Sequence, residues 1–258
     1  MNPVRGSADS VRESTRVSPE ARRVEATAVG GRTLEIFGQT PQVNAWIYSK
    51  LADHIRGDVL EVGSGIGNLS RLILKDADSA VLTDVEAQYI ERLDATFGSN
   101  ARVVVARFNL DEPAPEEIAP RRFDAIVAVN VIEHIQDDHR AVCTLASLLK
   151  PGGRLLIYVP AVPLAFGSLD RMLGHYRRYT AKSLEGLLRG AGLDPTPVRY
   201  FNLFGLLGWF VNGRILRRKS LSQKQIAIFE RLVPLLRIED KVQLPIGLGV
   251  ISCAAKPK

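Results

Sequence analysis

Two histidines lie in segments where a side chain could act on a bound substrate. His134 comes shortly after the apolar run 125–129, and His175 lies in the polar and aromatic segment 174–180. An imidazole titrates near neutral pH, so a positioned histidine can take a proton from an oxygen or nitrogen nucleophile. We therefore name His134 and His175 as candidate catalytic residues. The residue types alone also allow a packing role for His134 and a solvated loop around His175.

The residues after His175 read Tyr176-Arg177-Arg178-Tyr179. A guanidinium binds a carboxylate or phosphate through two parallel hydrogen bonds, and a tyrosine ring can line the site of a flat molecule. These four residues are candidate substrate contacts, and they favour an anionic or phenolic substrate.

A glycine-rich segment follows the apolar run 59–62 and offers a place for a nucleoside-containing ligand. Gly63, Gly65 and Gly67 alternate with other residues, and Asp84 follows Gly63 by 21 residues. Glycines let the backbone approach a ligand with its N–H groups, and a carboxylate after the next strand can accept hydrogen bonds from ribose hydroxyls. The spacing G-x-G-x-G differs from the G-x-G-x-x-G of dinucleotide sites, and no Walker lysine motif is present, so NAD and ATP fit poorly.

Short apolar runs alternate with amphipathic segments along most of the chain, which predicts strands alternating with helices. Such an order forms a parallel sheet covered by helices on both faces. The predicted strands are 59–62, 80–83, 102–105, 125–129 and 154–159. The predicted helices are 42–56, 69–75, 87–97 and 138–149, the last stopped by a turn at 151–153.

Beyond residue 160 the alternation loosens, and a helical insertion precedes the last strand. The predicted elements are a helix over 180–191, a strand over 195–201, helices within 203–240 including one over 223–236, and a strand over 244–255. The insertion starts with apolar and aromatic residues, which several arginines follow. We interpret it as a lid on the sheet. A peripheral contact of residues 200–219 with anionic lipid and a homodimer interface are the alternatives. The basic residues do not form a broad stripe with interleaved aromatics, so no nucleic acid is expected.

In its motifs and their order, the chain resembles the class I S-adenosylmethionine-dependent methyltransferases over about residues 40–200. Segment 59–67 resembles the family's first motif, E/D-x-G-x-G-x-G, and Asp84 its ribose-binding acid; 123–135 resembles its fourth-strand segment, and 148–155 the turn before its fifth strand. The resemblance implies an α/β, Rossmann-like, doubly wound sheet of seven strands with the last one antiparallel. It also implies S-adenosyl-L-methionine as cofactor and S-adenosyl-L-homocysteine as product. The residues that match the family's cofactor contacts are Glu61, Gly63, Ser64, Gly65, Gly67, Asp84, Asn109 and Asn130.

Asn109 departs from the family's pattern. Many members carry an aspartate after the third strand, where it contacts the adenine amino group, and Asn109 is the matching residue here. The amide oxygen of an asparagine can still accept a hydrogen bond. Asp111 is the alternative, unless it only caps the turn before Pro113.

The composition fits one folded domain preceded by a polar segment. The 258 residues are 46% hydrophobic and 24% charged, with a net charge of +6 and a mean hydropathy of +0.02, which excludes collagenous, coiled-coil and wholly disordered chains. The two cysteines, Cys143 and Cys253, indicate neither a disulfide framework nor a zinc site, so we expect no metal and a cytoplasmic protein. Residues 1–31 lack the apolar stretch of a signal peptide and are expected to form a flexible leader before a domain of residues 32–258.

Together these features predict transfer of a methyl group from S-adenosylmethionine to an oxygen or nitrogen atom of a small molecule, acidic or phenolic in character. Two alternatives stay open at this point. One is a lipid-linked or quinone-like acceptor that is methylated at the membrane surface, and the other is a partner protein that binds the cofactor without catalysing.

Overall fold

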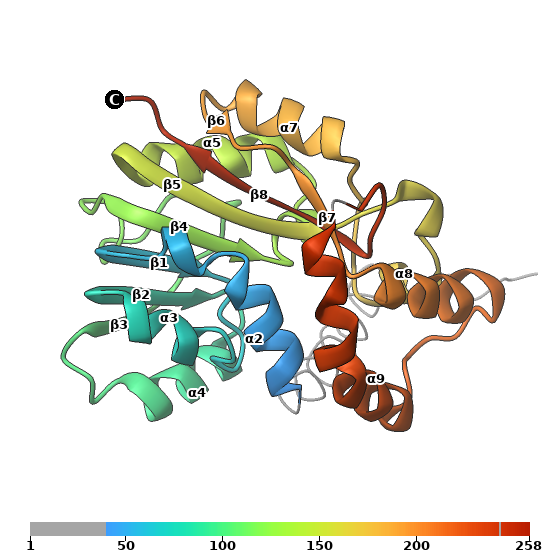
Figure 1. Cartoon of the computed structure of the whole chain (residues 1–258). Helices are drawn as coiled ribbons and strands as arrows, with labels where there is room; N and C mark the ends of the chain where they lie inside the picture. The colour runs from blue at the N-terminus through green and yellow to red at the C-terminus, as the bar shows by residue number, and fades with distance from the viewer. Residues whose placement is uncertain (1–39, 243) are drawn as a thin grey trace, which may run out of the picture.

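A mixed sheet with helices on both faces forms the centre of the computed structural model, which describes residues 40–242 and 244–258 (Figure 1). The strands pair in the order β3-β2-β1-β4-β5-β8-β6, and β7 also pairs with β8. Strands β1 to β5 run parallel, and β8 runs antiparallel to β5, as predicted. Their bounds are β1 Asp58–Val62, β2 Ser79–Asp84, β3 Val103–Arg107, β4 Phe123–Val129, β5 Leu149–Pro160, β6 Asp194–Pro195, β7 Arg199–Phe201 and β8 Gly249–Ala255. The leader predicted for residues 1–31 lies outside the described residues.

The strand predicted over 195–201 is broken into β6 and β7. Both short strands pair with β8, so β6 and β7 follow one another along the same edge of that strand. Pro197 lies between them and has no N–H to donate to the ladder. Among the described residues the sheet therefore has eight strands rather than seven. The turn predicted at 151–153 lies within the bounds of β5, which begins directly after helix α5.

The helices cover the two faces of the sheet in the way that the alternating pattern predicts. Leu60 packs with α5 and α7 on one face, whereas its neighbour Val59 packs with α2, α3 and α9 on the other. The bounds are α2 Pro41–Ser49, α3 Ser70–Asp76, α4 Ala87–Phe97, α5 Asp138–Leu148, α6 Ser168–Met172, α7 Ala181–Gly190, α8 Leu203–Phe210 and α9 Gln223–Leu236. Short 3-10 turns lie at η1 Ala52–His54, η2 Ile132–His134, η3 Pro163–Ala165 and η5 Arg237–Lys241, and a π-helical turn at η4 Val211–Ile215. In the described ranges, none of the helices has the length and apolar character needed to span a bilayer.

Helix α2 is shorter than predicted, and the insertion holds it in place. The helix ends at Ser49, and the chain tightens into η1 before β1. At its start the buried carboxylate of Glu230 accepts hydrogen bonds from the backbone N–H groups of Gln42, at 2.6 Å, and Val43, at 3.2 Å. A carboxylate at a helix N-terminus satisfies unpaired N–H groups and favours the helix dipole. Residues almost 190 positions apart are thereby joined.

Trp46 is the largest side chain in this contact. It has no exposed surface, packs 4.5 Å from the Phe201 ring between centroids, and donates from Nε1 to Asp240 at 2.9 Å. Its ring therefore joins α2, β7 and the end of the insertion.

We predict that Trp46→Ala lowers the free energy of unfolding by about 3–5 kcal/mol, because it leaves a cavity and removes the hydrogen bond to Asp240. Chemical denaturation of both proteins measures the difference. Glu91→Ala, an exposed position on α4, is the control and should change the value by no more than about 0.5 kcal/mol. A loss below about 1 kcal/mol for Trp46→Ala would show that α2 and the insertion are not held together by this side chain.

Candidate active site

The glycine-rich segment forms a tight loop between β1 and α3. Gly63, Gly65 and Gly67 have φ angles of 72°, 55° and 82°, in the left-handed region that favours glycine. A Cβ atom on Gly63 would lie 2.6 Å from Cγ2 of Val131, which belongs to the loop after β4. Glycine at this position therefore lets the loops after β1 and β4 touch.

The buried carboxylate of Glu61 stabilises this loop through hydrogen bonds. Its buried Oε2 accepts hydrogen bonds from the hydroxyl groups of Ser64, at 3.0 Å, and of Ser70. Burial raises the pKa of Glu61 to about 7, against the effect of these two hydrogen bonds. Glu61 and Ser64, both expected to contact the cofactor, are thus bonded to each other and shape the loop.

Asp84 ends β2 beside the same loop. Its carboxylate accepts hydrogen bonds from the backbone N–H groups of Gly65 and Val85, both at 2.8 Å, and of Glu86 at 3.1 Å. Burial raises the pKa of Asp84, and the three backbone hydrogen bonds oppose that rise. A carboxylate has about four acceptor positions, so this side chain keeps room for a ligand hydroxyl.

The two asparagines expected at the cofactor are placed differently. The side-chain amide of Asn109 donates to Glu112 Oε1 at 2.7 Å and accepts from the N–H of Asp111 at 3.0 Å, so it is bonded within its own loop. Asn130 follows β4 with a φ of 54° and donates its backbone N–H to the carbonyl of Tyr158. An adenine amino group would have to donate to Asn109 Oδ1, which already accepts one hydrogen bond from Asp111 and has a second acceptor position.

A hollow of about 640 Å³ lies where β3 and β4 end. Its lining includes His134 and Tyr176, the latter with 55% of its surface exposed. The remaining lining residues are Asp111, Gln136, Asp137, Asp138 and Arg140. Of the predicted site residues, the structure thus brings His134 and Tyr176 together at this hollow.

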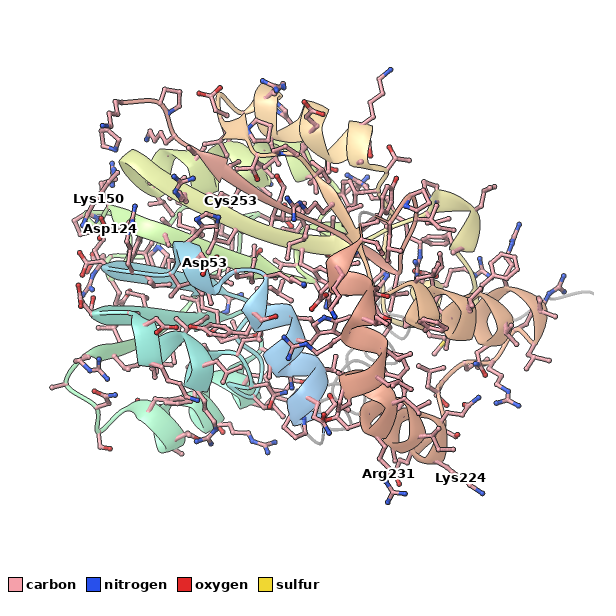
Figure 2. All side chains as sticks on the ribbon, in the orientation of Figure 1. Asp53, Asp124, Lys150, Lys224, Arg231 and Cys253 are labelled. Atoms are coloured by element: carbon pink, nitrogen blue, oxygen red, sulfur yellow. The ribbon has the colours of Figure 1, made fainter. Side chains whose placement is uncertain are left out.

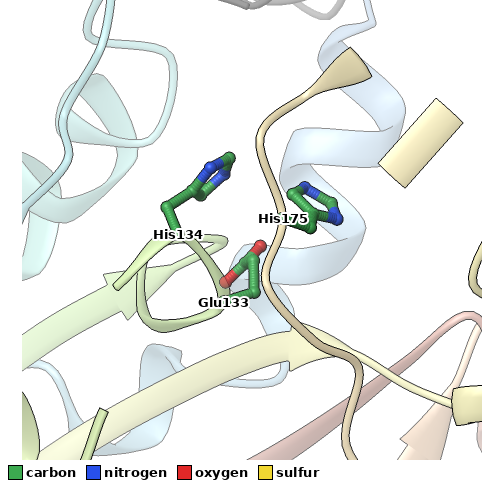
Figure 3. Close-up of side chains that lie close together, drawn as sticks. All are labelled: Glu133, His134 and His175. Atoms are coloured by element: carbon green, nitrogen blue, oxygen red, sulfur yellow. The ribbon is translucent and has the colours of Figure 1, made fainter. Parts of the chain in front are cut away.

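His134 and His175 come from distant segments and meet ring to ring (Figure 3). Their ring centroids lie 4.7 Å apart with an interplanar angle of 85°. Removal from water, and then the neighbouring His175, lower the pKa of His134 to about 3. The imidazole of His134 is therefore neutral at physiological pH and able to accept a hydrogen bond, and the residue is exposed at the hollow.

Glu133 lies beside both rings, and its carboxylate is fully buried (Figure 3). Neither of its carboxylate oxygens has a hydrogen-bond partner in the described part of the chain. Burial raises the pKa of Glu133 to about 8, so the group is mostly uncharged at neutral pH. One ligand atom each from Glu133, His134 and His175 lies within 4.8 Å of the others, and an imidazole and carboxylate set of this kind can hold a divalent transition metal.

A buried carboxylate that the sequence analysis missed, Asp170 in α6, orients His175. Asp170 Oδ1 lies 3.1 Å from His175 Nδ1 and 2.6 Å from Arg178 Nε. Burial opposes ionisation of Asp170, but the hydrogen bond from His175 and the charge of Arg178 outweigh it and lower its pKa to about 2. An ionised carboxylate only accepts, so Nδ1 carries the proton and Nε2 of His175 is free. A single aspartate five residues before His175 forms no motif, so the sequence offered no signal for this role.

Arg178 and Tyr179, both expected to contact the substrate, are buried and bonded to groups of the protein. Besides its ion pair with Asp170, Arg178 donates to the carbonyl of Ala161 at 2.7 Å, and its side chain has no exposed surface. The buried hydroxyl of Tyr179 donates to Asp138 at 2.8 Å. These bonds hold the loop in place, while Nη2 of Arg178 is buried without a hydrogen-bond partner among the described residues.

Arg177 is only partly available. It pairs with Asp138 at 2.7 Å and donates to the carbonyl of Gln136 at 2.6 Å, with 30% of its side chain exposed. Tyr176 is therefore the residue of this segment that presents an open surface to the hollow.

A family model described as a methyltransferase domain matches residues 37–198, more than half of the chain. The chain belongs to this methyltransferase family. Together with the fold, this makes it a class I S-adenosylmethionine-dependent methyltransferase, an enzyme family whose methyl donor is S-adenosylmethionine.

Two relatives illustrate the range of proteins that contain this methyltransferase domain. A highly reducing polyketide synthase of Phaeosphaeria nodorum is 31% identical over 264 aligned positions, which cover 85% of the chain but only 9% of the synthase. An uncharacterized methyltransferase of Mycobacterium tuberculosis is 26% identical over 142 positions, which cover 55% of the chain and 68% of that protein. The chain thus spans less than a tenth of the polyketide synthase that it matches.

Solved structures share the fold of this methyltransferase at low sequence identity. A putative methyltransferase from Bacillus halodurans has a TM-score of 0.57 and 16% identity, covering 83% of the chain and 99% of that structure. The N-methyltransferase NodS of Bradyrhizobium japonicum, solved with S-adenosyl-L-homocysteine, has a TM-score of 0.54 and 14% identity, covering 83% and 86%.

The residues at the ends of β1 and β2 fit the methyl donor of this family. The glycines of the loop carry no side chains at the ends of β1 and β2, and Asp84 keeps an acceptor position beside them. We propose that Gly63, Gly65, Gly67 and Asp84 hold the cofactor, that Glu61 and Ser64 shape the loop, and that Asn109 and Asn130 contribute from the neighbouring loops.

We predict that Asp84→Asn weakens binding of S-adenosylmethionine about 10- to 100-fold, because a hydrogen bond to a charged acceptor contributes about 1.5–3 kcal/mol. Isothermal titration calorimetry measures the Kd. Asp78→Asn, an exposed aspartate before the opposite end of β2, is the matched control and should leave the Kd unchanged. Equal affinity of Asp84→Asn and the wild type would remove Asp84 from the cofactor site.

Proposed function

We propose that this methyltransferase transfers a methyl group to an oxygen or nitrogen atom of a small molecule bound in the hollow beside His134. The observation that carries the proposal is the position of His134. Its neutral imidazole follows β4, lines the hollow, and lies three residues after Val131, the side chain in contact with the cofactor loop. A nucleophile in the hollow would thus lie between a proton acceptor and the donor loop.

The chemistry required of the chain's own residues is modest. Bound S-adenosylmethionine supplies a methyl group that already carries its leaving group, so the protein mainly holds the acceptor close and aligned. His134 accepts the hydrogen bond of the acceptor's O–H or N–H and takes its proton as methyl transfer proceeds. His175, fixed by Asp170, packs against the His134 ring and keeps its orientation, so we assign it as a positioning residue.

The lining of the hollow supports a hydroxyl or amine acceptor more than an acidic one. Arg177 and Arg140 are the arginines nearest the hollow, and both form ion pairs, with Asp138 at 2.7 Å and with Asp111 at 2.7 Å. Each guanidinium is therefore already partnered by a carboxylate. The exposed ring of Tyr176 offers a flat surface, which fits a phenolic or other planar acceptor. The polyketide synthase relative agrees with a small-molecule acceptor.

A lipid-linked or quinone-like acceptor is the second candidate. It is favoured by the exposed apolar and basic side chains of α8 and α9, which lie at the same end of the molecule as the carboxyl ends of the parallel strands (Figure 1). The third candidate, a partner protein that binds the cofactor without catalysing, gives the histidines no chemical role.

We predict that protein incubated with methyl-labelled S-adenosylmethionine and a cell extract transfers label to an extractable acceptor. Label in the aqueous small-molecule fraction supports the first candidate, and label in the lipid fraction supports the second. His134→Ala should lower kcat about 10²- to 10⁴-fold, as expected for loss of a proton acceptor, with the Kd of the cofactor within about threefold of the wild type. His139→Ala, an exposed histidine on α5, is the control. Full activity of His134→Ala would contradict the proposed role.

The pH dependence gives an independent test. His134 has its pKa lowered to about 3, so the neutral form that accepts the proton is present at all pH values above that range. We therefore expect kcat at saturating cofactor to show no acidic limb near pH 6.5, the ordinary value for histidine. An acidic limb centred there that disappears in His175→Gln would assign the proton acceptor to His175 instead.

A further inference from the structure

The exposed apolar side chains of this protein are concentrated in one segment. Of the fifteen large apolar residues that are exposed in the described part of the chain, twelve lie between Phe204 and Ile246. Single exposed apolar residues are common on protein surfaces, but a contiguous group marks a contact with another apolar body. We call the exposed side chains between Phe204 and Val242 the insertion face.

Within the insertion face, α8 and η4 present an apolar stripe. Phe204, Leu207, Val211 and Ile215 are spaced by three or four residues and are 48%, 56%, 42% and 61% exposed. Such spacing places side chains on one side of a helix. Leu206 is buried and turned toward the protein, so the helix is anchored on its inner side and apolar on its outer side.

The insertion face carries positive charge, because two of the three acidic residues of the insertion are buried and the third is paired with basic side chains. Glu230 accepts from the N-terminus of α2, Glu239 accepts from the N–H groups of Asn202 and Leu203, and Asp240 accepts from Trp46 and pairs with Lys50. These three are the acidic residues between positions 203 and 242, against eight basic ones. All eight basic residues are exposed: Arg214, Arg217, Arg218, Lys219, Lys224, Arg231, Arg237 and Lys241. Arg237 Nε lies 3.6 Å from Asp240 Oδ2. Figure 2 shows Lys224 and Arg231 pointing away from the body of the molecule at the end of α9.

We propose that the insertion face binds the surface of an anionic lipid bilayer. The α8–η4 stripe would lie in the boundary between headgroups and acyl chains, with the neighbouring arginines and lysines at acidic headgroups. Helices that lie in a membrane interface combine an apolar stripe with basic flanks in this way. Each basic residue near an anionic surface contributes favourably to the free energy of membrane binding. The charge complementarity selects acidic lipid over a second copy of this chain, because two such positive faces would repel each other.

The bound face would be connected to the reaction site through Trp209. This residue lies on α8, donates from Nε1 to Asp170 Oδ2 at 3.1 Å, and stacks under the guanidinium of Arg178 at 5.1 Å from its ring centroid. Asp170 in turn holds His175. A helix resting on a bilayer would thus contact the same carboxylate that orients the histidine pair. This part of the inference rests on the second candidate function, because it gives a membrane-borne acceptor a short path to the hollow.

Co-sedimentation of the full chain with vesicles tests the proposal. We expect binding to phosphatidylcholine vesicles that contain phosphatidylserine, no binding to pure phosphatidylcholine, and loss of binding at high salt. Two variants should each weaken partitioning into these vesicles on the order of 100-fold. The first, Phe204→Ser/Leu207→Ser, removes two apolar side chains that would insert in the bilayer. The second, Arg214→Gln/Arg217→Gln/Lys219→Gln, removes three positive charges. Lys75→Gln/Arg121→Gln/Arg122→Gln makes the same charge change at exposed positions outside the insertion and should bind as the wild type does.

The Kd for S-adenosylmethionine is measured for each variant and shows whether that variant is folded. Because vesicle binding is read without methyl transfer, failure of this proposal is distinguished from failure of the proposed function. The proposal is wrong if the wild type stays in solution with acidic vesicles at low salt, or if both insertion variants sediment as well as the wild type. It is also wrong if the wild type is a dimer in analytical ultracentrifugation that Phe204→Ser/Leu207→Ser converts to monomer, because the face would then be covered by a second copy.

Discussion

The buried charge of Asp170 is the constraint on which the rest of the site depends. A carboxylate without exposed surface is stable only when hydrogen-bond donors and positive charge surround it, and leaving it unpaired costs several kcal/mol. Here the donors are the N–H of Gly167, His175 Nδ1, Arg178 Nε and Trp209 Nε1, at 2.8, 3.1, 2.6 and 3.1 Å. They come from α6, the loop after it and α8. One charge therefore fixes the segment 173–179, the tautomer of His175 and the docking of the insertion together.

The same use of carboxylates recurs where the insertion meets the rest of the chain. Glu230 caps the start of α2, and Glu239 accepts from the N–H groups at the start of α8. Each acid satisfies backbone groups that would otherwise lack partners, so it strengthens a contact between distant segments. A consequence is that two of the three acidic residues of the insertion, Glu230 and Glu239, are buried, while the third, Asp240, lies beside Lys50 and Arg237. The charge of the insertion face thus follows from how the insertion is held.

The sequence predicted those features that depend on local pattern. Helices α4 and α9 have the predicted bounds, and the strands β1 to β5 lie where apolar runs alternate with amphipathic segments. What the residue types could not predict is which partner a polar side chain finds. Arg178 and Arg177 have the chemistry of anion binding, yet Arg178 is buried in an ion pair with Asp170, and the partly exposed Arg177 pairs with Asp138. The composition of segment 195–201 likewise predicts one continuous strand, whereas Pro197 lies where the strand divides into β6 and β7.

The direction of the parallel strands explains why the donor loop, the histidine pair and the insertion occupy one end of the molecule. Each loop that follows a parallel strand opens at the same edge of the sheet, so the loops after β1, β2 and β4 bring Gly63, Asp84 and His134 together whatever lies between them in sequence. The insertion leaves β7 at this edge and returns through β8, so it can only pack beside those loops. In the proposed function, a methyl acceptor enters from this edge. If the insertion face binds lipid as proposed, the surface beside these loops lies at the bilayer from which a lipid-borne acceptor would arrive.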